Sequence, residues 1–113
     1  MRLLVFLAKG FETIEFSAFI DVMGWAKTDF DCDIETVICG LNSKVVGSFN
    51  VSVLVDKTIE EVSADDYDAL AIPGGFEEFG FYEEAYNEKL LDLIRQFNSQ
   101  KKWIATVCVG ALP

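Results

Sequence analysis

The sequence predicts a doubly wound α/β domain, in which helices cover both faces of a mostly parallel sheet. Apolar runs of strand length alternate with segments of helical spacing along the 113 residues. The apolar runs are nearly continuous, as expected for parallel strands that are covered on both faces. The chain is 51% hydrophobic, contains no internal repeat or linker, and has the size of one domain.

The chain begins with a strand that is followed by a helix. Residues 2–8, RLLVFLA, form the first apolar run, and Gly10 ends it. From Thr13 the spacing of apolar residues becomes helical. One face of this predicted helix carries Phe16, Phe19, Ile20 and Met23.

The middle of the chain predicts a second strand and a hairpin. Residues 31–40 form the strand, and we expect its two cysteines, Cys32 and Cys39, to be core side chains. Residues 44–56 alternate apolar and polar side chains around a central turn, which is typical of a hairpin. Residues 58–68 are a turn-rich connection.

The last third predicts strand, helix and strand. Residues 69–75 form a short buried strand that Pro73 stops, because proline cannot donate to a central ladder. Residues 103–107 form the last strand, which we expect at or near the centre of the sheet. Between them, residues 83–100 predict one helix whose apolar face carries Leu90, Leu91, Ile94 and Phe97.

Composition argues against several classes of function. Nine basic and nineteen acidic residues give a net charge of −10, which opposes binding to nucleic acid or to an anionic membrane. No apolar run approaches the roughly 20 residues of a spanning helix. Because the chain has no histidine, we expect no metal and no cofactor. Its three cysteines are expected to be free thiols in the cytoplasm.

Three predicted strand ends carry unusual residues, namely residues 8–15 (AKGFETIE), 73–78 (PGGFEE) and 107–110 (VCVG). Because parallel strands end at one edge of a sheet, these segments should converge. A cysteine on a tight turn between strand and helix resembles a nucleophile elbow, and we expect Cys108 to take this position. A helix amino end there would favour the nucleophilic thiolate.

Glu15, Gly74 and Gly75 fit the same chemistry. Glycine amides are not shielded by side chains, so Gly74 and Gly75 could donate to an oxyanion or to an oxidised sulfur. If Glu15 reaches Cys108, repulsion between thiolate and carboxylate predicts a pair that shares one proton.

Structural explanations of these residues stay open. Cys108 could be a small core residue and PGG a simple turn, and Glu12 and Glu15 could complement a helix dipole, most readily Glu12. The aromatic side chains after the diglycine either pack inward or line a pocket or subunit contact; they are Phe76, Phe79, Phe81 and Tyr82.

The stretches LAKGFETIE, DVM, YDALAIPGG and IATVCVGALP together resemble the DJ-one/ThiJ/PfpI superfamily of flavodoxin-like proteins. The resemblance implies that Cys108 is the reactive cysteine and that Glu15 is a protonated glutamate hydrogen-bonded to its sulfur. It also implies that Gly74, Gly75 and the amide of Val109 face the sulfur, and that the protein is a homodimer.

The sequence departs from the family pattern in two places. Val109 stands where the peptidase branch has histidine, which argues against peptidase activity. Family members also continue beyond the elbow, so we expect residues 1–113 to be the N-terminal part of a single domain. A C-terminal continuation would then complete it as a second chain or segment.

The leading functional hypothesis is an enzyme of the glyoxalase or deglycase kind. In it Cys108 adds to a small reactive carbonyl such as an α-oxoaldehyde, and Glu15 moves protons. The alternatives are a stress-response protein whose Cys108 senses oxidation, and a cysteine peptidase or amidase.

Overall fold

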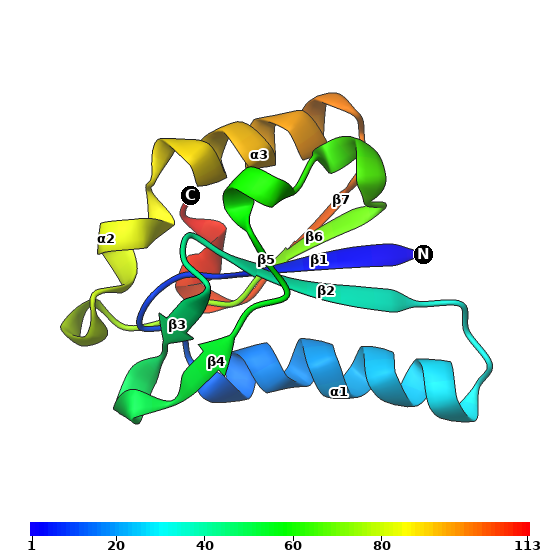
Figure 1. Ribbon diagram of the computed structural model, residues 1–113, viewed down its shortest axis with the longest axis horizontal. Helices are drawn as coiled ribbons and strands as arrows, with labels where there is room; N and C mark the ends of the chain where they lie inside the picture. Colours follow the sequence, from blue (N-terminus) through cyan, green and yellow to red (C-terminus); the bar gives the residue numbers. More distant parts are fainter.

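The computed structural model describes residues 1–113 and contains a five-stranded sheet with helices on both faces (Figure 1). The strand order is β5-β2-β1-β6-β7 and every pairing in this sheet is parallel. The predicted doubly wound α/β sheet is therefore confirmed. Its strands are β1 (Arg2–Leu7), β2 (Glu35–Gly40), β5 (Lys57–Thr58), β6 (Ala69–Ile72) and β7 (Trp103–Thr106).

The core lies in two layers on either side of β1. On one face, α1 (Thr13–Asp29) packs against the sheet, and its contacts include the predicted residues Phe16, Phe19, Ile20 and Met23. On the other face lie α2 (Phe81–Ala85) and α3 (Glu88–Ser99). Leu3 to Leu7 are all buried because β1 is covered on both faces. No helix is both long and apolar enough to cross a membrane.

A separate hairpin, formed by β3 (Lys44–Val46) and β4 (Ser52–Leu54), confirms the prediction for residues 44–56. Its tip contains two consecutive left-handed residues, Phe49 (φ 56°) and Asn50 (φ 63°). The hairpin is fastened to the loop after β1, because the Gly10 amide donates to the Val46 carbonyl at 2.9 Å.

The single helix predicted over residues 83–100 is wrong, because the chain forms α2 and α3 with a break between them. Asn87 is the N-cap of α3, and its side-chain oxygen accepts from the Lys89 amide at 2.9 Å. The capped residue Asn87 therefore separates α2 from α3. The buried side chains of α3 are Leu90, Leu93 and Phe97, with Ile94 partly buried.

The second strand is shorter than predicted. α1 continues to Asp29, so the chain reaches the sheet only at Glu35 rather than at residue 31. Cys32 therefore lies in the connection and is exposed, which corrects its expected place in the core. Cys39 is buried in β2 as predicted, and burial raises the pKa of its thiol to about 12.

Within residues 1–113 the last strand lies at an edge of the sheet, with its far side uncovered. β7 pairs with β6 alone, and no strand of the chain lies on its other side. Trp103 at its start is 81% exposed. The reason is the order of crossovers, which places β6 beside β1 and β7 beyond it.

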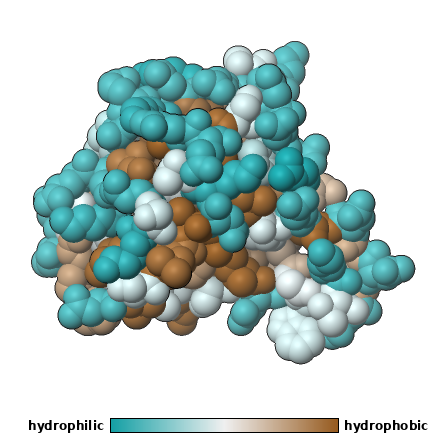
Figure 2. Space-filling view, in the orientation of Figure 1, coloured by the Kyte–Doolittle hydropathy of each residue, from teal (hydrophilic) through white to brown (hydrophobic).

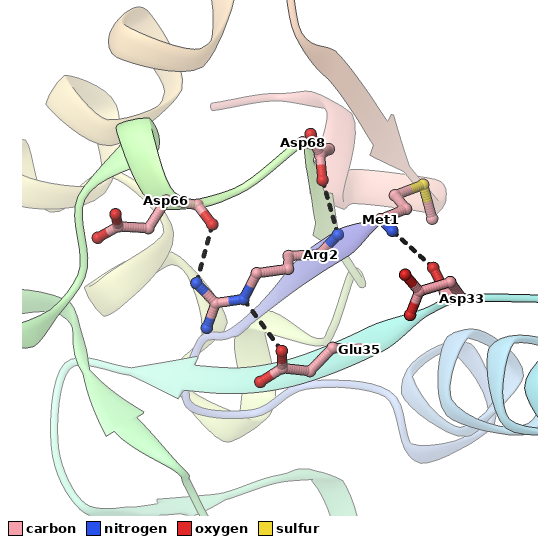
Figure 3. Close-up of polar contacts among 6 residues, drawn as sticks. All are labelled: Met1, Arg2, Asp33, Glu35, Asp66 and Asp68. Atoms are coloured by element: carbon pink, nitrogen blue, oxygen red, sulfur yellow. Dashed lines mark hydrogen bonds and ion pairs between the residues drawn. The ribbon is translucent and has the colours of Figure 1, made fainter.

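At the amino ends of the strands, Arg2 of β1 contacts two neighbouring segments, the start of β2 and residues 66–68 before β6 (Figure 3). Its guanidinium donates to Glu35 Oε2 at 3.1 Å and to the Asp66 carbonyl at 2.9 Å. Its amide donates to Asp68 Oδ2 at 2.7 Å. These contacts hold the end of the sheet that lies opposite the candidate site.

Candidate active site

The loops after β1 and β6 lie side by side at the carboxyl edge of the sheet. The chain leaves β1 towards β2 on one side and later returns to β6 on the other, so these two ends flank the topological switch point. Phe11 and Gly75 form an antiparallel bridge. The Glu12 amide donates to the Gly74 carbonyl at 2.8 Å, and the Phe76 amide donates to the Gly10 carbonyl at 3.1 Å.

The turn after β7 packs against the end of β6 through Gly110. A Cβ atom on Gly110 would lie 2.3 Å from the Ile72 carbonyl oxygen, so only glycine allows this approach. The Val107 amide donates to the same Ile72 carbonyl at 3.3 Å. The cysteine-bearing turn is therefore packed on the end of β6.

Gly74 lies where the three segments meet. A Cβ atom placed on it would be 2.8 Å from Glu15 Oε2, 2.9 Å from the Val107 carbonyl oxygen and 3.1 Å from the Gly110 amide nitrogen. The structure thus brings Glu15, the diglycine and the cysteine turn together at the edge where their strand ends were expected to converge.

Cys108 is exposed and has a left-handed backbone, with φ at 53°. A positive φ is uncommon in a residue other than glycine, and strained nucleophile elbows show this feature. The turn, Cys108–Ala111, is a four-residue 3₁₀ segment in place of the expected helix. The thiol makes no hydrogen bond within the chain, which leaves it open to solvent and small molecules.

Glu15 projects from the first turn of α1 and is half-buried. Its Oε2 accepts a hydrogen bond from the Gly74 amide at 2.7 Å. This amide, and not the Cys108 sulfur, is the group that Glu15 binds here. Glu12 occupies the N-cap of α1, and its side chain caps no amide.

The amide of Gly75 is an unused donor. Phe11 and Gly75 form a non-hydrogen-bonded pair, because the bonds of the bridge run between their neighbours. The Gly75 amide consequently donates to no group of the chain. Val109 is half-buried and packs against the core.

The surface pockets of the molecule lie elsewhere. Two adjoin the Glu60–Lys89 ion pair, beside the start of α3, and a third lies next to Trp25 on α1. None is lined by Glu15, Gly74 or Cys108. No group of three or more acidic or cysteine side chains is placed to hold a metal ion.

Sequence comparison places the chain in a known family. The model of the DJ-1/PfpI family matches residues 1–112. An uncharacterized protein of Staphylococcus aureus is 39% identical over 77 residues, which are 66% of this chain and 42% of that protein. Deglycase PfpI of Pyrococcus furiosus is 36% identical over 66 residues, which are 58% of this chain and 38% of that protein.

Solved structures of the family have the same fold. Drosophila melanogaster DJ-1beta matches with a TM-score of 0.83 and 30% identity over 98% of this chain and 56% of that one. Oxidized Toxoplasma gondii DJ-1 matches with a TM-score of 0.78 and 29% identity over 96% of this chain and 56% of that one. The chain thus spans little more than half the length of these relatives, and it belongs to the DJ-1/PfpI family.

Proposed function

We propose that this chain carries the reaction centre of a cysteine-dependent enzyme that acts on small α-oxoaldehydes. The observation that carries the proposal is the meeting of Glu15, Gly74 and the Cys108 turn at one point. An exposed thiol, a neighbouring carboxyl group and an unused amide are the groups that carbonyl addition needs. The name of one relative, Deglycase PfpI, agrees with this chemistry.

The reaction can be written for methylglyoxal. The Cys108 thiolate forms a bond to the aldehyde carbon, and the carbonyl electron pair moves to oxygen, where the Gly75 amide can stabilise the charge. Protonation of that oxygen gives a hemithioacetal. Glu15 then removes the proton on C1, which gives an enediolate whose negative charge lies on the C2 oxygen. The hydroxyl proton on the C1 oxygen moves to the C2 oxygen, and Glu15 returns its proton to C2, which leaves the thioester of lactate. Water cleaves the thioester to lactate and the free thiol, with no external oxidant or reductant.

The test is lactate formation from methylglyoxal. We expect turnover by the wild type, a loss of about 100-fold or more in Cys108→Ser, and little change in Cys32→Ser, which removes the other exposed thiol. Equal lactate formation by wild type and Cys108→Ser would refute the proposal.

A second candidate function is oxidation sensing by the same thiol. The exposure of Cys108 favours it, because sulfenic acid formation requires access of peroxide to the sulfur. This function predicts a gain of one or more oxygen atoms on Cys108 after mild peroxide, without lactate formation. Mass spectrometry of the Cys108 peptide, set beside the lactate assay, distinguishes the two functions. A cysteine peptidase has less support, because Val109 and not a histidine follows Cys108.

A further inference from the structure

Three phenylalanines form an exposed cluster beside the candidate site, which we name the aromatic shelf: Phe49, Phe76 and Phe79. Phe49 is 76% exposed and Phe76 is 42% exposed. The Phe79 ring contacts both in edge-to-face geometry, with centroids at 5.1 Å from Phe49 and 6.3 Å from Phe76. Figure 2 shows hydrophobic residues at the surface in the region of the β3–β4 hairpin.

The shelf is held in place by the backbone. Phe49 has φ at 56°, an unfavourable conformation for a bulky side chain. The preceding residue, Ser48, is buried, and both its amide and its hydroxyl donate to the Phe11 carbonyl, at 2.9 and 3.1 Å. The Gly47 amide donates to the Val51 carbonyl at 2.7 Å and closes the tip. An exposed aromatic ring held at a conformational cost indicates a functional role.

The anchors of the shelf are the residues that build the site. The Phe11 carbonyl accepts both hydrogen bonds from Ser48. Phe11 also pairs with Gly75 in the antiparallel bridge. Phe76 follows Gly75 directly, and its amide binds the Gly10 carbonyl. The shelf therefore begins next to the unused Gly75 amide, at the edge of the loop that carries the diglycine.

We propose that the aromatic shelf is a specificity subsite that binds an aromatic or other bulky apolar substituent of the substrate. The inference rests on the proposed function and names its substrate class, the aryl- and alkyl-substituted α-oxoaldehydes. Apolar surface that such a substituent covers on Phe76 and Phe49 favours binding. The adjacent acidic residues Glu77 and Glu78 oppose anionic substituents.

The first measurement compares kcat/KM for phenylglyoxal and for methylglyoxal. In Phe76→Ala we expect the kcat/KM for phenylglyoxal, divided by that for methylglyoxal, to fall about tenfold, because the phenyl substituent loses its contact with the Phe76 ring. The matched control is Phe30→Ala, because Phe30 is 77% exposed and follows the C-terminal end of α1, whereas the site adjoins the N-terminal end. Phe30→Ala should keep the wild-type ratio.

The second measurement needs no turnover. It compares the rates at which N-benzyliodoacetamide and iodoacetamide alkylate Cys108, in wild type, Phe76→Ala, Phe76→Gln and Phe30→Ala. We expect the ratio of benzyl to unsubstituted reagent to fall in both Phe76 variants and to stay constant in the control. A fall in this ratio without turnover of either aldehyde would support the shelf and refute the proposed enzyme. A ratio within twofold of wild type in both Phe76 variants would overturn the shelf.

Discussion

Glu15 and Gly74 connect the candidate chemistry to the fold. The half-buried Glu15 carboxylate accepts a hydrogen bond from the Gly74 amide at 2.7 Å. It therefore holds the diglycine in place while remaining close to the cysteine turn. The Gly75 amide donates to no group of the chain, and we propose it as a donor to a reacting oxygen. One carboxyl group is thus proposed both to fix the loop and to move protons.

Substitution of Glu15 separates these two roles. Glu15→Ala leaves the Gly74 amide without its partner, and we expect a loss of about 1–3 kcal/mol in the free energy of unfolding. Glu15→Gln keeps a carbonyl oxygen for that amide and should retain most of the stability. It should nevertheless change the pH profile of Cys108 alkylation, because an amide does not titrate. Denaturant unfolding and alkylation rates measure the two effects, and a profile in Glu15→Gln identical to wild type would leave Glu15 with a structural role only.

At the scale of elements, the site depends on close approach between turns rather than on any one helix. The cysteine turn contacts β6 through Gly110, where a methyl group would lie 2.3 Å from the Ile72 oxygen and 3.0 Å from the Pro73 carbonyl carbon. Both neighbours are backbone atoms, which cannot rotate away as a flexible side chain can.

We therefore expect Gly110→Ala to destabilise the chain by about 1–3 kcal/mol through overpacking. The matched control is Gly24→Ala, since Gly24 lies in α1 with no atom within 4 Å of an added Cβ. That change should stabilise by about 0.5–1 kcal/mol, as alanine favours the helix. Thermal unfolding of both variants checks the pair. A stable Gly110→Ala with wild-type Cys108 reactivity would show that the turn is free to move.

The elements show what sequence can and cannot predict. β1 was predictable because a strand covered on both faces must be apolar throughout, and Pro73 marked the end of β6. The break at Asn87 was missed, since its capping bond competes with a continuous helical pattern on both sides. β5 is only two residues long and gives no periodic signal.

The same limit applies to the site. The predicted strand ends indicated that Glu15, Gly74 and Cys108 approach one another, because parallel strands end at one edge of a sheet. The Glu15–Gly74 hydrogen bond and the left-handed Cys108 depend on tertiary contacts within a few ångströms. Such contacts leave no trace in local sequence spacing.

At the scale of the whole molecule, β7 has an open edge and an exposed Trp103. Open edges and exposed aromatic surface favour association, so we propose that further polypeptide from a C-terminal continuation covers them. Residues 1–113 alone should then self-associate or unfold without a cooperative transition, so the unfolding of the variants above is compared in the polypeptide that includes this continuation. Sedimentation and thermal unfolding test this, and a cooperative monomer with a fast-reacting Cys108 would contradict it.

The homodimer expected from sequence stays a prediction, and α1 supports it. The solvent-facing side of this helix carries the exposed apolar residues Ile14, Val22 and Trp25. If two copies meet there, Trp25→Lys should raise the dimer dissociation constant about tenfold or more, because a charge would enter an apolar contact. Analytical ultracentrifugation measures the dissociation constant. The comparison variant is Trp103→Lys, which lies at the open edge of the sheet. Equal dimerisation by wild type and Trp25→Lys would exclude this face.

Competition among the three thiols for one reagent tests the central claim most directly, that Cys108 is the reactive centre. Cys39 is buried with a pKa of about 12 and stays protonated at pH 8. Cys32 is exposed but lies in the connection between α1 and β2, away from the strand ends that form the candidate site. With limiting iodoacetamide at pH 8, peptide mapping should find Cys108 labelled first, Cys32 later and Cys39 last. Faster labelling of Cys32 than of Cys108 would contradict the account.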